Sequence, residues 1–454
     1  MNKFWIPGYI PAFLMLCTTL CASAQKGEAY EMNVEGVKVI VQPSGNEIIE
    51  IQTIIKGGVQ NYPASLQGIE SLAINALTEC GTLRDDKNSF KNKLDKVSAQ
   101  VYGYSGMDYA TFNMNCIKSD FQVVWPLYTD ALTAPGFNDK EFSRIRQDAI
   151  NIIKANASQP DYAIGRMARE KTFAGKDYAK TPEGNEQSVS KITANQAKTY
   201  YRSILHRSRM LIVVVGEIEK EDLVSKIQKM LANVPQGKEF QLKKEIYAAT
   251  KSSFQSEKKD MATNYLQGIT GGPAPGTAGF DAFQLAMRIF ANRHFLEIRT
   301  NNGLSYAPQS WFDGGATSTA NISVSTTDPN KYIAVASTMI EKIKKEGFTE
   351  EEVKNMKTTY LTGFFYRQET NGAQASSLVS NEVLHNNWRR ALTLNDDLKK
   401  VTVTDIDKAF QKYINHISWS YQGNPDKVNA ALFTSAKKTK VALPKSKVSP
   451  SKNN

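Results

Sequence analysis

The feature that most constrains the fold is an order of elements that occurs twice along the chain. Alternating strands at 31–42 and 48–55 are followed mostly by helical segments. Residues 235–249, with a proline, a glycine and several lysines, indicate a linker. After it come two strands, a glycine-rich loop, a helix at 280–299, strands within 304–327 and further helices. We therefore predict the α+β class, with two duplicated half-domains that each carry an antiparallel or mixed sheet covered by helices.

The beginning of the chain has the pattern of an export signal. Lys3 precedes an apolar run at 10–21, and Ala22-Ser23-Ala24 is a small-residue cleavage site. The run is short for a membrane-spanning helix, so we expect no integral membrane segment after cleavage. Cys21 follows a poor lipoprotein signal, which favours a soluble form over a lipid anchor. We expect a periplasmic protein, either free or held at a membrane through a partner.

At 454 residues the chain is long enough for two domains. The predicted organisation is a signal peptide at 1–24, an N-terminal half at 25–234, the linker at 235–249, a C-terminal half at 250–436 and a basic, disordered tail at 437–454.

Charge gives no sign of a nucleic-acid partner. The net charge is +11, but six of the lysines lie in the tail 437–454, which contains no acidic residue. The rest of the chain is only weakly positive, which does not match a nucleic-acid-binding surface.

Cleavage would leave Cys80 and Cys116 as the remaining cysteines. A disulfide between them is compatible with an oxidising compartment, but their spacing does not decide it. Cys80 completes the apolar face of a helix and Cys116 lies in an alternating strand, so the sequence favours two packed thiols.

The segment 68–82, GIESLAINALTECGT, predicts an amphipathic helix that ends at Gly81. Its apolar residues recur at helical spacing, while Ser71, Asn75 and Thr78 share the opposite face. In zinc peptidases of the H-x-x-E-H type, such a face carries two histidines and a catalytic glutamate. The corresponding positions here are Ser71, Ile74 and Asn75. We therefore interpret 68–80 as a degenerate metal helix, with no metal held by this chain.

A second motif supports this comparison. The stretch Arg299–Tyr306, R-T-N-N-G-L-S-Y, resembles the Arg/Tyr motif of the pitrilysin/insulinase metallopeptidase family. The strand, Gly/Pro loop and helix before it resemble the start of that family's second half-domain, and residues 31–75 and 200–218 resemble parts of its first. The resemblance covers nearly all of the mature chain and implies two halves that face each other as a clamshell.

The family's third zinc ligand, a glutamate, has no counterpart here. The corresponding stretch, 150–154, reads Ile-Asn-Ile-Ile-Lys, and Asp148 is the nearest carboxylate. The four histidines are His206, His294, His385 and His416, none within five residues of another. We expect the first two to cap or pack. The chain also lacks the G-x-S-x-G and phosphate-loop motifs.

The resemblance implies a function without catalysis by this chain alone. Arg299 and Tyr306 would bind substrate and assist the zinc site of a paralogous H-x-x-E-H subunit, forming a heterodimer or larger assembly that cleaves extended peptides. Zinc would then lie on the partner. One alternative is a structural or peptide-binding protein that retains the peptidase fold. Another is a self-sufficient enzyme with a different site.

Overall fold

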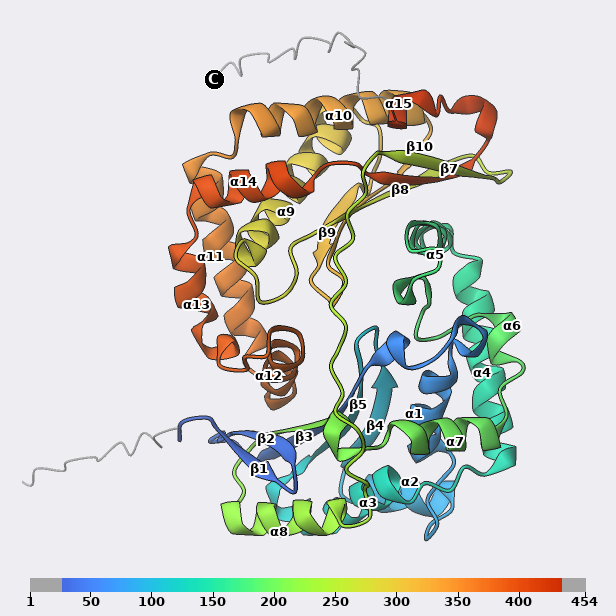
Figure 1. Ribbon diagram of the computed structural model, residues 1–454, viewed down its shortest axis with the longest axis vertical. Coiled ribbons are helices and arrows are strands. Elements are labelled where there is room, and N and C mark those ends of the chain that lie inside the picture. Colours follow the sequence, from blue (N-terminus) through green and yellow to red (C-terminus); the bar gives the residue numbers. More distant parts are fainter. Residues whose placement is uncertain (1–26, 435–454) are drawn as a thin grey trace, which may run out of the picture.

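The computed structural model describes residues 27–434, so the predicted signal peptide and the whole of the predicted tail lie outside the described residues. Two sheets are built one after the other along the chain (Figure 1). We refer to residues 30–231 as the first half and to residues 253–434 as the second half.

The first half contains a six-stranded sheet in the order β1-β2-β6-β3-β5-β4. Only β2 and β6 pair in parallel, so the sheet is mixed. Its strands are β1 (Tyr30–Val34), β2 (Val37–Gln42), β3 (Ile48–Lys56), β4 (Gln100–Ser105), β5 (Tyr109–Ile117) and β6 (Met210–Val215). Its helices are α1 (Ile69–Glu79), α2 (Lys87–Asp95), α3 (Phe121–Thr133), α4 (Asp139–Ala157), α5 (Pro160–Thr172), α6 (Glu186–Val189), α7 (Ala194–Ile204) and α8 (Lys220–Leu231).

The second half contains a five-stranded mixed sheet in the order β7-β11-β8-β10-β9, in which β7 and β11 are parallel. Its strands are β7 (Ser253–Lys258), β8 (Asn264–Gly271), β9 (Gln309–Asp313), β10 (Thr319–Thr326) and β11 (Ser418–Gly423). Its helices are α9 (Phe280–Phe295), the π-helix η6 (Leu296–Asn301), α10 (Pro329–Glu346), α11 (Glu350–Arg367), α12 (Asn371–His385), α13 (Arg390–Lys400), α14 (Val403–Tyr413) and α15 (Ala431–Thr434). The predicted α+β class with two helix-covered mixed sheets is confirmed.

Helix ends follow local sequence signals. Thr193 and Gln196 form a reciprocal capping box at the start of α7, and Thr349 and Glu352 do the same for α11. The helix expected at 280–299 is α-helical only to Phe295 and continues as the π-helix η6. Such a change of helix type is often found at functional sites.

One helix of each half packs on the sheet of the other half. Helix α5 of the first half packs on β8 and β11, and α12 of the second half packs on β3 and β6 (Figure 1). Leu378 and Val379 of α12 meet Ile54 of β3 in a separate apolar cluster. All interior residues of β3 are buried, because α12 covers the second face of this strand.

An extended segment, 232–252, connects the halves without regular secondary structure. It is held to the first half by a reciprocal pair of hydrogen bonds. The Gln60 side chain donates to the Lys243 carbonyl at 2.8 Å and accepts from the Lys243 N–H at 3.0 Å. Tyr247 then packs edge-on against Phe173, with ring centroids 5.1 Å apart. The segment is therefore fixed along its course rather than free.

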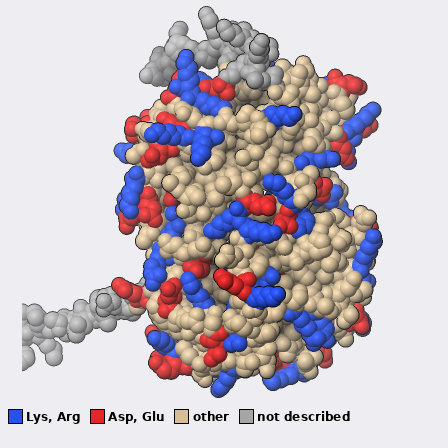
Figure 2. All heavy atoms as spheres, viewed as in Figure 1, with Lys and Arg blue, Asp and Glu red and all other residues tan. Residues whose placement is uncertain are grey.

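Every helix within 27–434 is too short or too polar to cross a bilayer. On the face shown in Figure 2, basic and acidic side chains are intermixed. That face offers no continuous basic area of the kind that a nucleic acid would occupy. Cys80 and Cys116 are buried free thiols.

Candidate functional site: a degenerate metal helix and an exposed Arg/Tyr pair

The helix α1 spans Ile69–Glu79, within the predicted 68–80, with Gly68 as its N-cap in the left-handed region at φ 94°. Asn75 is exposed and Ser71 is partly exposed. Within the described residues, neither side chain makes a hydrogen bond or an ion pair. The prediction that Thr78 shares this open face is wrong, because Thr78 is buried.

The position of the catalytic glutamate is occupied by packing. Ile74 is fully buried on the side of α1 that faces β4. A Cβ atom at Gly103 of β4 would lie 2.5 Å from the Cγ2 atom of Ile74, so the helix and strand are in close contact here. The position therefore offers a methyl group to the sheet and no proton acceptor to solvent.

One carboxylate in this helix was missed from the sequence. Glu70 is fully buried, and its oxygens accept hydrogen bonds from Ser105 at 2.8 Å, Asn61 at 2.9 Å and Tyr200. Burial raises the pKa of Glu70, and these hydrogen bonds oppose the rise. An acidic residue inside an apolar helix face was the available signal. Since its oxygens are already bonded, Glu70 is a paired structural carboxylate rather than a free ligand.

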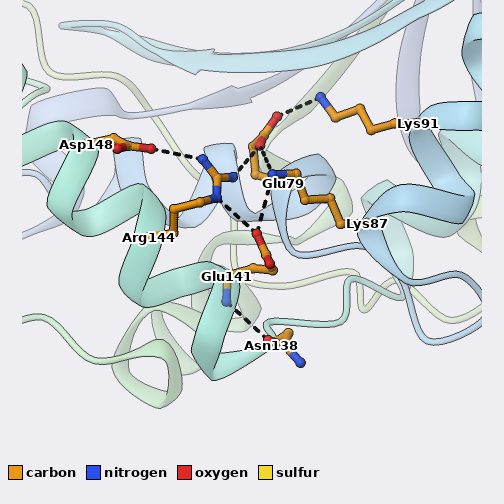
Figure 3. A network of polar contacts seen from close by, with 7 residues as sticks. All are labelled: Glu79, Lys87, Lys91, Asn138, Glu141, Arg144 and Asp148. Carbon is orange, nitrogen blue, oxygen red and sulfur yellow. Dashed lines mark hydrogen bonds and ion pairs between the residues drawn. The ribbon is translucent and has the colours of Figure 1, made fainter.

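Residues 150–154, which the family resemblance places at the third ligand position, lie in α4. Ile150 and Ile153 are buried, and Asp148 accepts a hydrogen bond from Arg144 at 2.9 Å (Figure 3). Arg144 also bonds Glu79, at the end of α1, at 2.6 Å. These groups form an ion-pair network between two helices.

The same network fixes the charge of Glu79. Burial acts to raise its pKa, but hydrogen bonds from Lys91 and Arg144 and the positive charge of Lys91 and Lys87 outweigh burial and lower the pKa to about 2. Among residues 27–434, no three His, Cys, Asp or Glu side chains come together in a way that could hold a metal ion.

His294 and His385 lie in separate packed surroundings. His294 is buried at the end of α9, with its Nε2 3.1 Å from the Tyr332 hydroxyl and its Nδ1 3.0 Å from the Ser310 hydroxyl. Burial lowers the pKa of His294 to about 3. His385 packs edge-on against Phe280, with ring centroids 4.8 Å apart. These contacts are packing and hydrogen bonding, as expected for His294.

Arg299 and Tyr306 lie together on the surface of the second half. The guanidinium carbon of Arg299 is 5.1 Å from the ring centroid of Phe295 and 5.9 Å from that of Tyr306. Tyr306 is 87% exposed. The turn between them is closed by hydrogen bonds from the Gly303 N–H to the Arg299 carbonyl and from the Leu304 N–H to the Ile298 carbonyl. Both rings thus lie within cation–π range of the Arg299 guanidinium, and Arg299 and Tyr306 are both exposed to solvent.

The chain does not bring its two motifs into one site. The π-helix that carries Arg299 packs on α9 and α10, whereas α1 packs on β4, α7 and α4. Figure 1 shows α1 and α10 in different halves, well separated. The Arg/Tyr pair therefore does not face the degenerate metal helix α1 of the same chain.

The edge of the first sheet next to α1 is lined by aromatic side chains. Strand β4 is the last strand of its sheet and pairs with β5. Tyr102 and Tyr104 of β4 are 44% and 50% exposed. An edge strand presents unpaired backbone groups that can accept a further strand.

Comparison with known proteins identifies similar sequences and folds. Residues 191–360 match the family model described as "Peptidase M16 inactive domain". A protein called non-peptidase homolog YmxG, from Helicobacter pylori, is 19% identical over 94% of this chain and 100% of its own length.

Solved structures share the fold. The crystal structure of a peptidase M16 inactive domain from Pseudomonas fluorescens superposes with a TM-score of 0.79 at 17% identity, covering 87% of this chain and 98% of the other. The periplasmic protease PqqL from Escherichia coli has a TM-score of 0.75 at 16% identity, covering 93% of this chain but 49% of PqqL. The clamshell architecture predicted from the sequence is thereby confirmed. The chain is a homologue of the pitrilysin/insulinase (M16) metallopeptidases that carries an Arg/Tyr motif and lacks the H-x-x-E-H ligands.

Proposed function

We propose that this chain is the non-catalytic, substrate-binding subunit of an exported heteromeric zinc peptidase that acts on peptides. The observation that carries this proposal is the exposed pair Arg299 and Tyr306, which lies away from the chain's own degenerate helix α1. A pair of this kind is suited to face a zinc site on another subunit.

The chemistry of the pair fits that role. A guanidinium and a phenol both donate hydrogen bonds, and both suit the oxyanion that forms when water attacks a peptide carbonyl. Within the described residues, neither Arg299 nor Tyr306 donates a hydrogen bond to a protein acceptor. Their donors are therefore available, and only their stacking on each other and on Phe295 fixes them.

Substrate binding would use the open edge of the first sheet. An extended peptide would pair with β4 as an added strand, and Tyr102 and Tyr104 would contact its side chains. Backbone pairing gives affinity with little sequence selectivity, so we expect a broad range of extended peptides.

The partner would be a paralogous subunit with an intact H-x-x-E-H helix, and zinc would lie there. The length relationship to PqqL supports an additional unit, because this chain corresponds to about half of that periplasmic protease. Export is supported by the signal-peptide pattern at 1–24. We expect hydrolysis only when the two subunits are together.

Reconstitution tests the proposal. The purified chain is mixed with an H-x-x-E-H protein that co-purifies with it, and cleavage of a fluorogenic peptide is measured. Loss of an oxyanion donor typically costs about 100- to 1,000-fold in rate, so we expect a fall of that order for the double variant Arg299→Ala/Tyr306→Phe. Arg202→Ala, an exposed arginine on α7, serves as the control that keeps full activity. Unchanged cleavage with the double variant would rule the proposal out.

The second candidate is a structural or peptide-binding protein that retains the peptidase fold. The full-length match to a non-peptidase homologue favours it. This candidate predicts peptide binding, or assembly with other subunits, with no cleavage in any mixture. A pair of subunits that both lack zinc would support it.

A further inference from the structure

A cavity of about 580 Å³ lies among α9, α11, α12, α13 and the turn between β9 and β10. It is separate from both motifs, since neither Arg299 and Tyr306 nor any residue of α1 lines it. Phe280, Tyr360, Phe364 and Leu394 supply an apolar lining. The volume suits a large side chain with its adjoining backbone.

The turn between β9 and β10 closes one side of the cavity with bare backbone. A Cβ atom at Gly314 would lie 2.6 Å from the ring of Phe280, and one at Gly315 would lie 2.8 Å from the Tyr178 hydroxyl. Neither glycine can carry a side chain without a shift of its neighbours. The turn therefore contacts Phe280 and Tyr178 through bare backbone.

Two arginines contribute positive charge to the cavity, and one of them is paired with a carboxylate. Its lining includes Arg367 and Arg390 but no aspartate or glutamate. Arg390 is neutralised by a two-pronged ion pair with Asp281, in which one N–H donates at 2.9 Å. Arg367, by contrast, has no hydrogen bond and no ion pair within the described residues. An unpaired guanidinium beside an apolar pocket is suited to a carboxylate.

Neutral polar groups complete the lining on α12. Ser377 and Ser380 are one turn apart, and the Ser380 hydroxyl donates to the Ser377 carbonyl at 3.2 Å. His385 follows near the end of the helix. Burial, together with the positive charge of Arg390, lowers the pKa of His385 to about 4, so it is neutral at pH 7 and can donate one hydrogen bond and accept another.

We propose that this cavity binds the carboxyl-terminal end of a peptide, with Arg367 pairing with the terminal carboxylate and a large apolar last side chain lying against Phe280, Tyr360 and Phe364. The inference deepens the peptide-binding part of the proposed function and rests on it. It is independent of the Arg/Tyr pair, because binding here needs neither zinc nor a partner subunit. Peptides with a free, apolar carboxyl end would be held by this subunit itself.

Binding by the isolated full chain tests the site. The probes are two fluorescein-labelled peptides of glycine and serine that end in phenylalanine, one with a free carboxylate and one amidated. Hydrogen bonds to charged groups contribute more free energy than those between neutral groups. We therefore expect fluorescence polarisation to show about 10-fold or more tighter binding of the free acid than of the amide. Arg367→Gln should weaken the free acid to the level of the amide and leave the amide unchanged.

Two further variants make the outcome decisive. Arg202→Gln, an exposed arginine on α7 outside the cavity, should keep the preference for the free acid. Ser380→Leu, which fills the cavity from α12, should weaken both peptides. Equal binding of the acid and the amide, or no binding of either, would overturn the proposal. Arg299→Ala/Tyr306→Phe should keep the preference, which separates failure of this site from failure of the proposed assistance to a zinc subunit.

Discussion

Asp108 accepts a hydrogen bond from the backbone N–H of Ala316 at 3.1 Å, which joins the first half to the turn between β9 and β10 in the second. The same carboxylate accepts from the Tyr178 hydroxyl at 2.5 Å. Burial raises the pKa of Asp108, and both hydrogen bonds oppose the rise. This contact lies beside Gly315 and ties the turn that closes one side of the cavity to the first half.

We predict that Asp108→Ala lowers the free energy of unfolding by about 1–3 kcal/mol, because it leaves the Tyr178 hydroxyl and the Ala316 N–H buried without an acceptor. Urea denaturation measures the change. Asp95→Ala, at the exposed end of α2, is the control and should stay within about 0.5 kcal/mol of wild type. Equal stability of the two variants would show that the contact contributes nothing.

Much of the fold could be predicted because its signals are local. Apolar periodicity, Gly68 and Gly81 located α1, and the recurrence of strands before helices indicated two halves. The exchange of α5 and α12 could not be predicted, since an amphipathic pattern does not say which sheet a helix covers. For the same reason the burial of the second face of β3 under α12 could not be predicted.

The candidate site was predicted in part. Arg299 and Tyr306 are neighbours on one turn, so a sequence motif was sufficient to find them. Glu70 was missed because its acceptor role depends on Tyr200, which is 130 residues away in the chain. The burial of Ile74 and Thr78 likewise depends on packing between elements, which helical periodicity alone does not specify.

Helix α1 permits a test with the same substitution on two faces. Ile74→Glu places a carboxylate in the close contact between α1 and Gly103 of β4, at a position that is fully buried from solvent. We expect a loss of about 3 kcal/mol or more, in line with burying an unpaired polar group. Asn75→Glu, on the exposed face, should cost at most about 0.5 kcal/mol. Thermal unfolding of both variants measures these two losses of stability. A stable Ile74→Glu variant would mean that this position opens to solvent.

The Arg/Tyr pair should contribute little to the stability of the isolated chain. Tyr306 is 87% exposed, and its contact with Arg299 is a solvent-facing stack worth about 0.5–1 kcal/mol. Arg299→Ala/Tyr306→Phe should therefore unfold within about 1 kcal/mol of wild type in urea. A larger loss would mean that the pair supports the fold of η6, and a fall in peptide cleavage would then no longer report on catalysis.

Buried His294 predicts a dependence of stability on pH. Its pKa is lowered from 6.5 to about 3, so the unfolded chain binds a proton below pH 6.5 that the folded chain does not bind. The stabilising contribution of neutral His294 is thus complete above the unfolded pKa and is lost as the pH falls from 6.5 toward about 3. The loss approaches about 1.4 kcal/mol for each pH unit.

The measurement is the free energy of unfolding between pH 6.5 and about 5, above the ordinary range of carboxylates. His294→Gln cannot take up the proton and keeps hydrogen-bonding capacity toward Tyr332 and Ser310, so its stability should fall less steeply with acid than that of wild type. His416→Asn removes an exposed histidine whose backbone has φ 46°, which asparagine tolerates, and should keep the slope of wild type. Parallel curves for wild type and His294→Gln would show that His294 takes up its proton in the folded chain as readily as in the unfolded one.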